Sequence, residues 1–193
     1  MKECHSIPLN DKDVVADIGA YVGTYSKWCA IQGVCQVRAF EPTPFTCKVL
    51  RRNLADFDFC EAVEAAVVGD SFRGISVALH VSDGLGVTNG LVGRKRGQVD
   101  VEVPVVKFMD ATVGATILKV DVEGAEYSYD FSALPKTVRA LMIDFHPVSS
   151  DWKEKAQAIV DSLHIQGFED VVSPDWSNGW TRAGSWLRRI DQI

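Results

Sequence analysis

The sequence predicts an α/β fold built on a parallel β-sheet, and the order of its apolar segments is the main reason. A short apolar strand over 14–18 leads through a glycine-flanked turn into a helical segment over 21–31. A strand over 36–41 and a helix over 44–54 follow, and a third strand is expected over 62–68. Strands that alternate with helices in this way form parallel sheets, because each helix returns the chain to the start of the next strand.

The middle of the chain interrupts this alternation. Segments 75–81 and 99–106 alternate between apolar and polar residues, as half-exposed strands do, and they predict an inserted β-hairpin. The glycine-rich segment 82–97 would be its long loop. The alternation resumes with a strand over 115–121, which is followed by a turn at Gly124 and a short helix.

The last third of the chain completes the sheet. We expect a strand over 140–146, an amphipathic helix over 152–166 and two closing strands over 168–172 and 185–190. Because no internal repeat or interdomain linker is visible in the 193 residues, they are expected to form a single domain.

Composition and charge exclude several classes of protein. With 47% hydrophobic and 24% charged residues, the chain has the composition of an ordinary globular domain. Its net charge of −6 opposes a broad phosphate-binding surface, so duplex nucleic acid is not an expected partner. Since no apolar run approaches the ~18 residues of a spanning helix and the start lacks a signal-peptide core, we expect no membrane span and a cytoplasmic location.

Acidic residues flank the first glycine turn and end the second strand. Gly19 and Gly23 follow Asp17, and Glu41 ends the next strand. This pattern is typical of a ribose-bearing cofactor site, although an ordinary strand, turn and helix beside an incidental acid is the alternative. Asp17 would repel the phosphates of a dinucleotide but attract the cationic sulfonium and ammonium of S-adenosylmethionine. Glu41 is expected to accept hydrogen bonds from the ribose hydroxyls.

Three segments in order resemble one family of enzymes. They are DIGAYVGTYS at 17–26, FEPTP at 40–44 and ILKVDVEGAE at 117–126. On these motifs the chain resembles the FkbM-type S-adenosylmethionine-dependent methyltransferases. The resemblance implies a Rossmann-like class I methyltransferase sheet, with seven strands in the order 3-2-1-4-5-7-6, the last antiparallel, flanked by helices. It also implies O-methylation, often of sugars or glycosylated products.

Two features depart from the family pattern. Asp144 stands where the family commonly has a glutamate, which leaves the acid chemistry intact. Only thirteen residues precede the first predicted strand, fewer than family members often have. We therefore expect that the chain is cut from, or evolved within, a longer polypeptide with other domains.

The candidate cofactor-binding residues follow the glycine turn and the next strand ends. They are Asp17, Gly19, Ala20, Tyr21, Gly23, Thr24, Glu41, Pro42, Ala65 and Asp121.

The candidate catalytic residues lie at the ends of two later strands. Lys119, Asp121 and Glu123 alternate along one strand and should project to one side at its carboxyl end. Asp144 and His146 do the same on the following strand. Asp121 is expected to position the acceptor and handle its proton, with His146 as the next candidate. Lys119 would lower the pKa of an acceptor hydroxyl or pair with an acid.

Two further interpretations concern the same region. Glu126 falls in a first helical turn, where a carboxylate stabilises the helix dipole, so a structural role is expected for it. Asp121, Asp144 and His146 could also hold Mg²⁺ or Mn²⁺ with water, although spacing alone does not establish a metal.

The preferred function is methylation of a hydroxyl on a sugar or glycan. Methylation of RNA ribose is an alternative that would need a basic groove, and a non-catalytic cofactor-binding assembly module is another. Trp176 and Trp180 flank Asn178-Gly179 in a loop that should reach the carboxyl edge of the sheet. They could stack on a sugar ring, but packing in the core is at least as common for a tryptophan pair near a strand, so both interpretations stay open.

Overall fold

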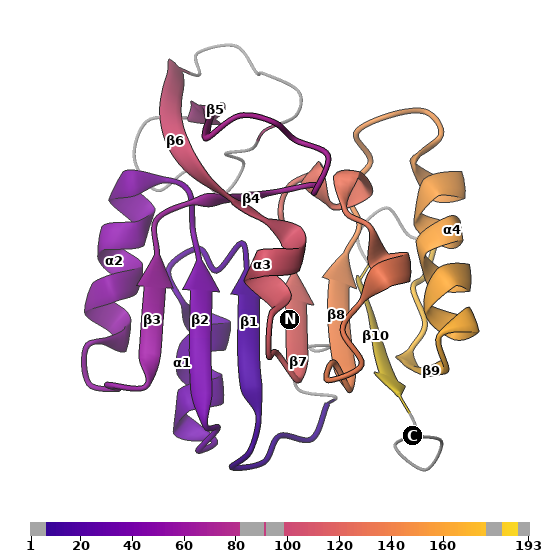
Figure 1. Ribbon diagram of the computed structural model, residues 1–193, viewed down its shortest axis with the longest axis horizontal. Helices are drawn as coiled ribbons and strands as arrows, with labels where there is room; N and C mark the ends of the chain where they lie inside the picture. Colours follow the sequence, from indigo (N-terminus) through magenta and orange to yellow (C-terminus); the bar gives the residue numbers. More distant parts are fainter. Residues whose placement is uncertain (1–6, 82–90, 92–98, 177–182, 189–193) are drawn as a thin grey trace.

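A seven-stranded sheet lies at the centre of the computed structural model, which describes residues 7–81, 91, 99–176 and 183–188 (Figure 1). Its strands, in chain order, are β1 (Val14–Ile18), β2 (Gln36–Phe40), β3 (Cys60–Val63), β7 (Ile117–Val120), β8 (Ala140–Asp144), β9 (Phe168–Val172) and β10 (Ala183–Arg188). Across the sheet they follow the order β3-β2-β1-β7-β8-β10-β9. All pairings are parallel except those of β10, which runs antiparallel to β8 and β9. The predicted fold class and strand order are therefore confirmed.

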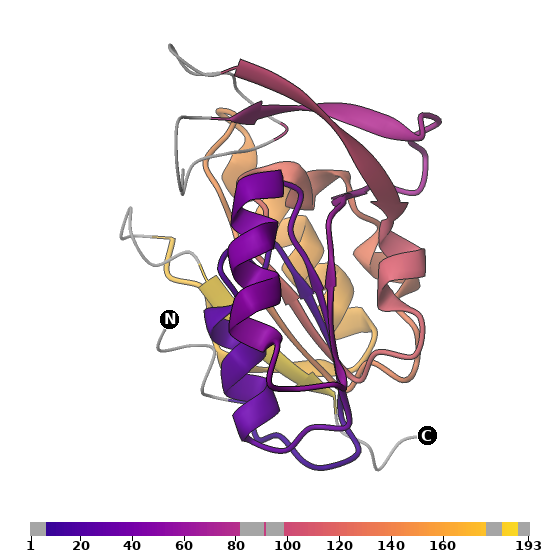
Figure 2. The same cartoon turned by 90° about the vertical axis from the view of Figure 1, so that its left-hand side faces the viewer.

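Helices cover both faces of this sheet (Figure 2). One face carries α1 (Thr24–Ile31) and α2 (Pro44–Leu54), and the other carries α3 (Phe108–Thr112) and α4 (Trp152–Ile165). The 3₁₀ helices η2 (Ala125–Ser128) and η3 (Phe131–Ala133) follow β7. Because successive strand residues point to opposite faces, β1 places Val15 in the core layer under α1 and Ala16 in the layer under α4.

A small second sheet lies over the carboxyl ends of the central strands (Figure 1). It consists of β4 (Ala66–Val68), β5 (Ser76–Val81) and β6 (Val99–Lys107). The antiparallel pairing of β5 with β6 confirms the inserted hairpin. β4 pairs in parallel with β6, so this insertion is joined to the central sheet directly after β3.

The structure corrects several predicted elements. The single strand predicted over 62–68 is wrong: β3 ends at Val63, and β4 belongs to the second sheet, because its pairing partner is β6. The first helix begins at Thr24 rather than residue 21, since Tyr21 and Gly23 have left-handed φ angles of 53° and 85°. Sequence reasoning missed α3 altogether.

Some predicted features lie outside the described residues. They are most of the glycine-rich segment 82–97, the residues Asn178, Gly179 and Trp180, and the end of the last strand. Within the described part of the chain, no helix combines the length and hydrophobicity needed to cross a membrane.

Candidate active site

The turn after β1 is fixed between two neighbouring strands. The amides of Gly19 and Ala20 both donate to the carbonyl of Phe40 at the end of β2, at 3.0 and 2.9 Å. On the other side, a Cβ atom on Gly19 would lie 1.8 Å from the carbonyl oxygen of Asp121. Gly19 also has a φ of 78°, so a side chain here would meet both strain and collision. A glycine is therefore required where β1 and β7 approach each other.

Asp17 and Lys119 form a buried ion pair beneath this turn. They are register partners on the parallel strands β1 and β7, so their side chains point to the same face. The ammonium of Lys119 lies 3.0 Å from Asp17 Oδ1 and donates to the carbonyl of Gly19 at 3.0 Å. The hydroxyl of Ser26 donates to Asp17 Oδ2 at 2.6 Å. Asp17 is fully buried, so its carboxylate supports the turn from below.

Glu41 holds the ends of two loops together with its carboxylate. Oε2 accepts a hydrogen bond from the amide of Tyr21 at 3.0 Å, and Oε1 accepts one from the amide of Thr43 at 2.8 Å. Burial raises the pKa of Glu41 above its ordinary value, although these amide hydrogen bonds and the charge of Lys119 oppose the shift. A carboxylate has more acceptor positions than these two contacts use, so Glu41 can still accept from a ligand.

Two cavities open at this edge of the sheet, and they share a wall. The first, of about 250 Å³, is lined by Glu41 and by apolar groups that include Phe40, Ala65 and Leu79. The second, of about 190 Å³, lies toward β8 and is lined by Asp144 among others. Both cavities are bounded by Gly19, Tyr21 and Asp121. A ligand that passes over the glycine turn would therefore contact both.

Most of the predicted cofactor-binding residues line these cavities. Gly19, Tyr21, Glu41, Pro42, Ala65 and Asp121 line the first, and Ala20 and Thr24 line the second. Asp17 and Gly23 line neither. Gly23 instead precedes α1, and a Cβ there would lie 2.5 Å from Leu50 Cδ1, so its part is to let α1 and α2 pack closely.

The candidate catalytic residues do not all project together as their alternation predicted. Asp121 lines both cavities and Glu123 lines the first. Lys119 reaches the wall of the second cavity, but its ammonium is turned back toward Asp17 and is 3.7 Å from Asp121 Oδ2. The structure thus favours pairing with acids as the role of Lys119.

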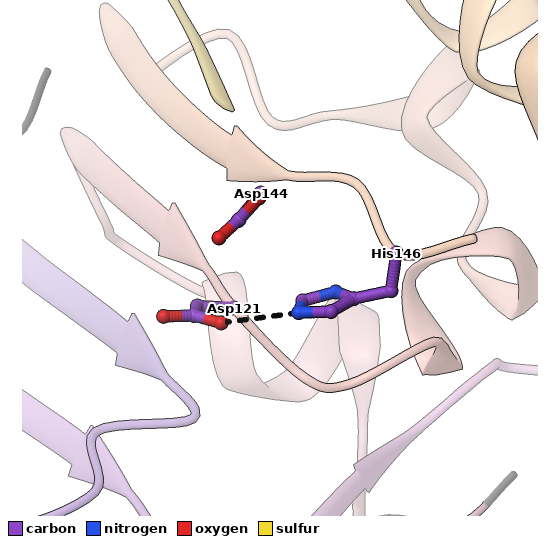
Figure 3. Close-up of side chains that lie close together, drawn as sticks. All are labelled: Asp121, Asp144 and His146. Carbon is purple, nitrogen blue, oxygen red and sulfur yellow. Dashed lines mark ion pairs between the residues drawn. The ribbon is translucent and has the colours of Figure 1, made fainter. Parts of the chain in front are cut away.

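His146 and two aspartates meet at the ends of β7 and β8 (Figure 3). The Nε2 atom of His146 lies 3.8 Å from Asp121 Oδ1 and 3.7 Å from Glu123 Oε1. One possible ligand atom from each of Asp121, Asp144 and His146 lies within 4.8 Å of the other two. The predicted convergence of polar groups therefore holds for these three residues, and their donor set is one that divalent cations accept.

Glu126 hydrogen-bonds His146 on the side of the ring opposite to Asp121 and Glu123. Its Oε1 accepts from the His146 amide at 2.6 Å and lies 3.3 Å from His146 Nδ1. Burial lowers the pKa of His146, but the hydrogen bond and charge of Glu126, with the charges of Glu123 and Asp144, outweigh it and raise that pKa to about 9. His146 is therefore mostly protonated at neutral pH.

Trp176 does not contribute to either cavity. Its ring lies 5.8 Å from that of Trp152 and 5.6 Å from that of Phe145, and its Nε1 donates to Gln157 at 3.2 Å. Trp176 therefore packs against α4, which corresponds to the core alternative rather than to a sugar platform.

Sequence reasoning missed two contributions to the site. One is Ser26, whose hydroxyl donates to Asp17 and which lies in the first turn of α1. Its position three residues after Gly23 could have placed it on the helix face that covers β1. Leu79 lines the first cavity from β5. No local signal marks it, because only the folding of the second sheet over the central one brings it there.

Comparison with known proteins supports the fold. The sequence matches no protein-family model and no curated protein. Among solved structures, it is similar to the methyltransferase FkbM from Methylobacillus flagellatus, with a TM-score of 0.54 and 15% identity over 94% of this chain. A precorrin-6y C5,15-methyltransferase from Geobacter metallireducens is similar over 97% of this chain and 86% of its own, with a TM-score of 0.51 and 12% identity.

These two structures share the fold of this chain. The seven-stranded sheet with its antiparallel β10 is the fold of the class I methyltransferases, so the FkbM-type resemblance is confirmed at the level of the fold. The chain covers 45% of the FkbM structure, and thus spans less than half of that protein's length.

Proposed function

We propose that this chain is an S-adenosylmethionine-dependent methyltransferase that transfers a methyl group to a hydroxyl of a sugar or glycan. The observation that carries the proposal is the pair of joined cavities over the glycine turn. Glu41 lies in one cavity and Asp144 in the other, while Asp121 lies in the wall that they share. A cofactor site and a site for proton handling are thus adjacent.

The residues of the first cavity fit the cofactor by their chemistry. Glu41 would accept hydrogen bonds from the ribose hydroxyls, and the apolar side chains of Phe40, Ala65 and Leu79 would contact the adenine ring. Asp121 offers a carboxylate to the positive charge of the sulfonium. When bound, S-adenosylmethionine supplies a methyl group attached to a positively charged sulfur, which makes that carbon electrophilic.

The chain's own residues would align the acceptor and manage its proton. Positioning is the larger part of this work, since an in-line displacement needs the acceptor oxygen at a fixed place and angle. Asp121 is the first choice to accept the proton of the hydroxyl, because 39% of its side chain is exposed and it borders both cavities. His146 and Asp144 complete the polar surroundings of the acceptor oxygen.

The sugar class of acceptor rests on the resemblance to FkbM-type enzymes. The polar cluster of Asp121, Asp144 and His146 supports a hydroxyl acceptor, because such an acceptor has a proton to release. The net charge of −6 disfavours RNA, which would need a basic groove. The cluster also disfavours a non-catalytic module, since a scaffold has no need to gather like charges at a strand edge.

A transfer assay tests the proposal. The protein is incubated with S-adenosylmethionine labelled in its methyl group and with a panel of sugars, glycans and, separately, RNA. Label on a sugar oxygen, located by mass spectrometry and NMR, is the expected result. Label on RNA ribose would replace the acceptor class, and cofactor binding without transfer to any acceptor would favour the assembly module.

A further inference from the structure

Glu126 is a buried carboxylate that the proposed reaction does not use. It lies in η2, none of its surface is exposed, and its charge therefore needs partners inside the protein. Oε2 accepts a hydrogen bond from the amide of Gly124 at 2.8 Å, within the same turn. Oε1 accepts one from the amide of His146 at 2.6 Å, after the end of β8. Glu126 thus joins the segment after β7 to the segment after β8.

The same carboxylate determines how the imidazole of His146 is presented. Glu126 Oε1 lies 3.3 Å from His146 Nδ1. Because an ionised carboxylate can only accept, Nδ1 must carry the hydrogen of this contact. The other nitrogen, Nε2, then faces Asp121 and Glu123 on the opposite side of the ring, at 3.8 and 3.7 Å.

The backbone between Asp121 and Glu126 is shaped for this contact. Glu123 has a φ of 53°, which is uncommon for a residue with a side chain, and Gly124 has a φ of 107°. Two successive residues in the left-handed region reverse the chain, so that Glu126 returns toward β8 while Asp121 faces the cavities. Strain of this kind is kept where the surrounding contacts over-determine it, as the Glu126 contacts do.

We propose that Glu126 is a positioning residue for the methyl transfer, holding His146 with Nδ1 protonated and Nε2 turned toward the acceptor side of the cluster. This inference rests on the proposed function. It replaces the sequence-based expectation that Glu126 only stabilises a helix dipole, because its oxygens bind the turn at Gly124 and the strand-end His146. It also gives Glu126, the last residue of the ILKVDVEGAE motif at 117–126, a role in the site.

The charged groups around His146 come from three directions. Glu126 lies on η2, Asp121 and Glu123 on the segment between β7 and η2, and Asp144 at the end of β8. Of these, Glu126 hydrogen-bonds the backbone amide of His146 and also lies beside Nδ1. Its removal should therefore change the tautomer and orientation of the ring, and not only its charge.

The test compares Glu126→Gln with Glu126→Asp and with Glu154→Gln, a control on the exposed surface of α4. Nitrogen NMR of the four histidines, with His146 assigned through His146→Gln, shows which ring nitrogen carries the hydrogen when it is recorded above the His146 pKa of about 9, where the ring is neutral. We expect Nδ1 to be protonated in the wild type. In Glu126→Gln the hydrogen should shift in part from Nδ1 to Nε2, because the amide of glutamine can also donate to Nδ1, whereas Glu126→Asp should keep it on Nδ1.

The kinetic arm measures transfer in the same variants. Glu126→Gln should lower kcat by about 10- to 100-fold while the affinity for S-adenosylhomocysteine stays within about threefold. In the His146→Gln background, Glu126→Gln should cause little further loss, because both changes remove one function.

Two results would overturn the inference. One is a folded Glu126→Gln protein with an unchanged His146 spectrum, and the other is an equal loss of kcat with and without His146. If no transfer or cofactor binding is found at all, the proposed function fails, while the NMR arm still decides whether Glu126 orients His146.

Discussion

At the scale of single residues, the buried pair of Asp17 and Lys119 changes how the glycine turn is understood. The strand-end position of Asp17 predicted a carboxylate in contact with the cofactor, but in the structure Lys119 and Ser26 take up its two oxygens. The sequence could not show this without the strand register, which makes Asp17 and Lys119 neighbours. Glu41 was easier to predict, because its position depends only on the strand that it ends.

Asp17→Ala should therefore reduce stability as well as cofactor binding. The substitution removes the carboxylate 3.0 Å from the ammonium of Lys119, whose side chain is 11% exposed, and leaves it the more distant Asp121 Oδ2 at 3.7 Å. Removing one member of a buried ion pair costs about 3 to 5 kcal/mol, measured as a loss in the free energy of unfolding in urea. Asp11→Ala, at an exposed position, is the control. Wild-type stability in Asp17→Ala would show that the pair does not hold the turn.

Asp121→Asn should abolish transfer and keep cofactor binding. The amide preserves the shape of the side chain but loses the charge that accepts the acceptor's proton, so we expect kcat to fall by about 10²- to 10⁴-fold. S-adenosylhomocysteine affinity, measured by calorimetry, should change far less. Turnover within a few-fold of wild type would assign the proton to another group. His146 was the next candidate from the sequence, but with a pKa of about 9 it is already mostly protonated at neutral pH.

The same assay in EDTA examines the metal interpretation. Because the sulfonium already activates the methyl carbon, we expect transfer to continue after chelation. Loss of turnover in EDTA that Mn²⁺ restores would instead make Asp121, Asp144 and His146 its ligands, in agreement with their spacing of 4.8 Å or less.

At the scale of elements, local patterns predicted the strands and helices that pack against the central sheet. The break between β3 and β4 could not be predicted, because residues 62–68 form a nearly continuous apolar run. β4 leaves the central sheet because it pairs with β6, which is distant in the sequence. The helix α3 has five residues, too few for a helical period to be visible in the sequence. For β4, pairing with β6 in the folded chain was decisive.

The close approach of β1 and β7 gives a prediction with a matched control. Gly19 and Gly33 have φ angles of 78° and 80°, but a Cβ on Gly33 would meet nothing within 4 Å. Gly33→Ala should therefore cost only the backbone strain, about 1 to 2 kcal/mol. Gly19→Ala should lose more stability and at least about tenfold in S-adenosylhomocysteine affinity, since β1 must move away from Asp121. Equal effects in the two variants would contradict this account.

At the scale of the whole molecule, the sheet order and the FkbM-type fold were predictable, because the three motifs at 17–26, 40–44 and 117–126 occur in the same order as in that family. The acceptor was not, since it depends on how the second sheet and the later segments enclose the carboxyl edge. Trp176 is an example of a residue whose position in the chain did not predict its contacts. Its loop was expected on the acceptor side, but its ring packs against Trp152 and Phe145.

The central claim is that the joined cavities bind S-adenosylmethionine, and calorimetric titration with S-adenosylhomocysteine tests it most directly. We expect one site per chain in the wild type and in Glu61→Ala, an exposed control on β3. Glu41→Ala should bind ~1.5 to 3 kcal/mol more weakly, a loss of about 10- to 150-fold, because it removes a charge-assisted contact to the ribose. No binding by the folded wild type, or equal binding by Glu41→Ala, would contradict the account.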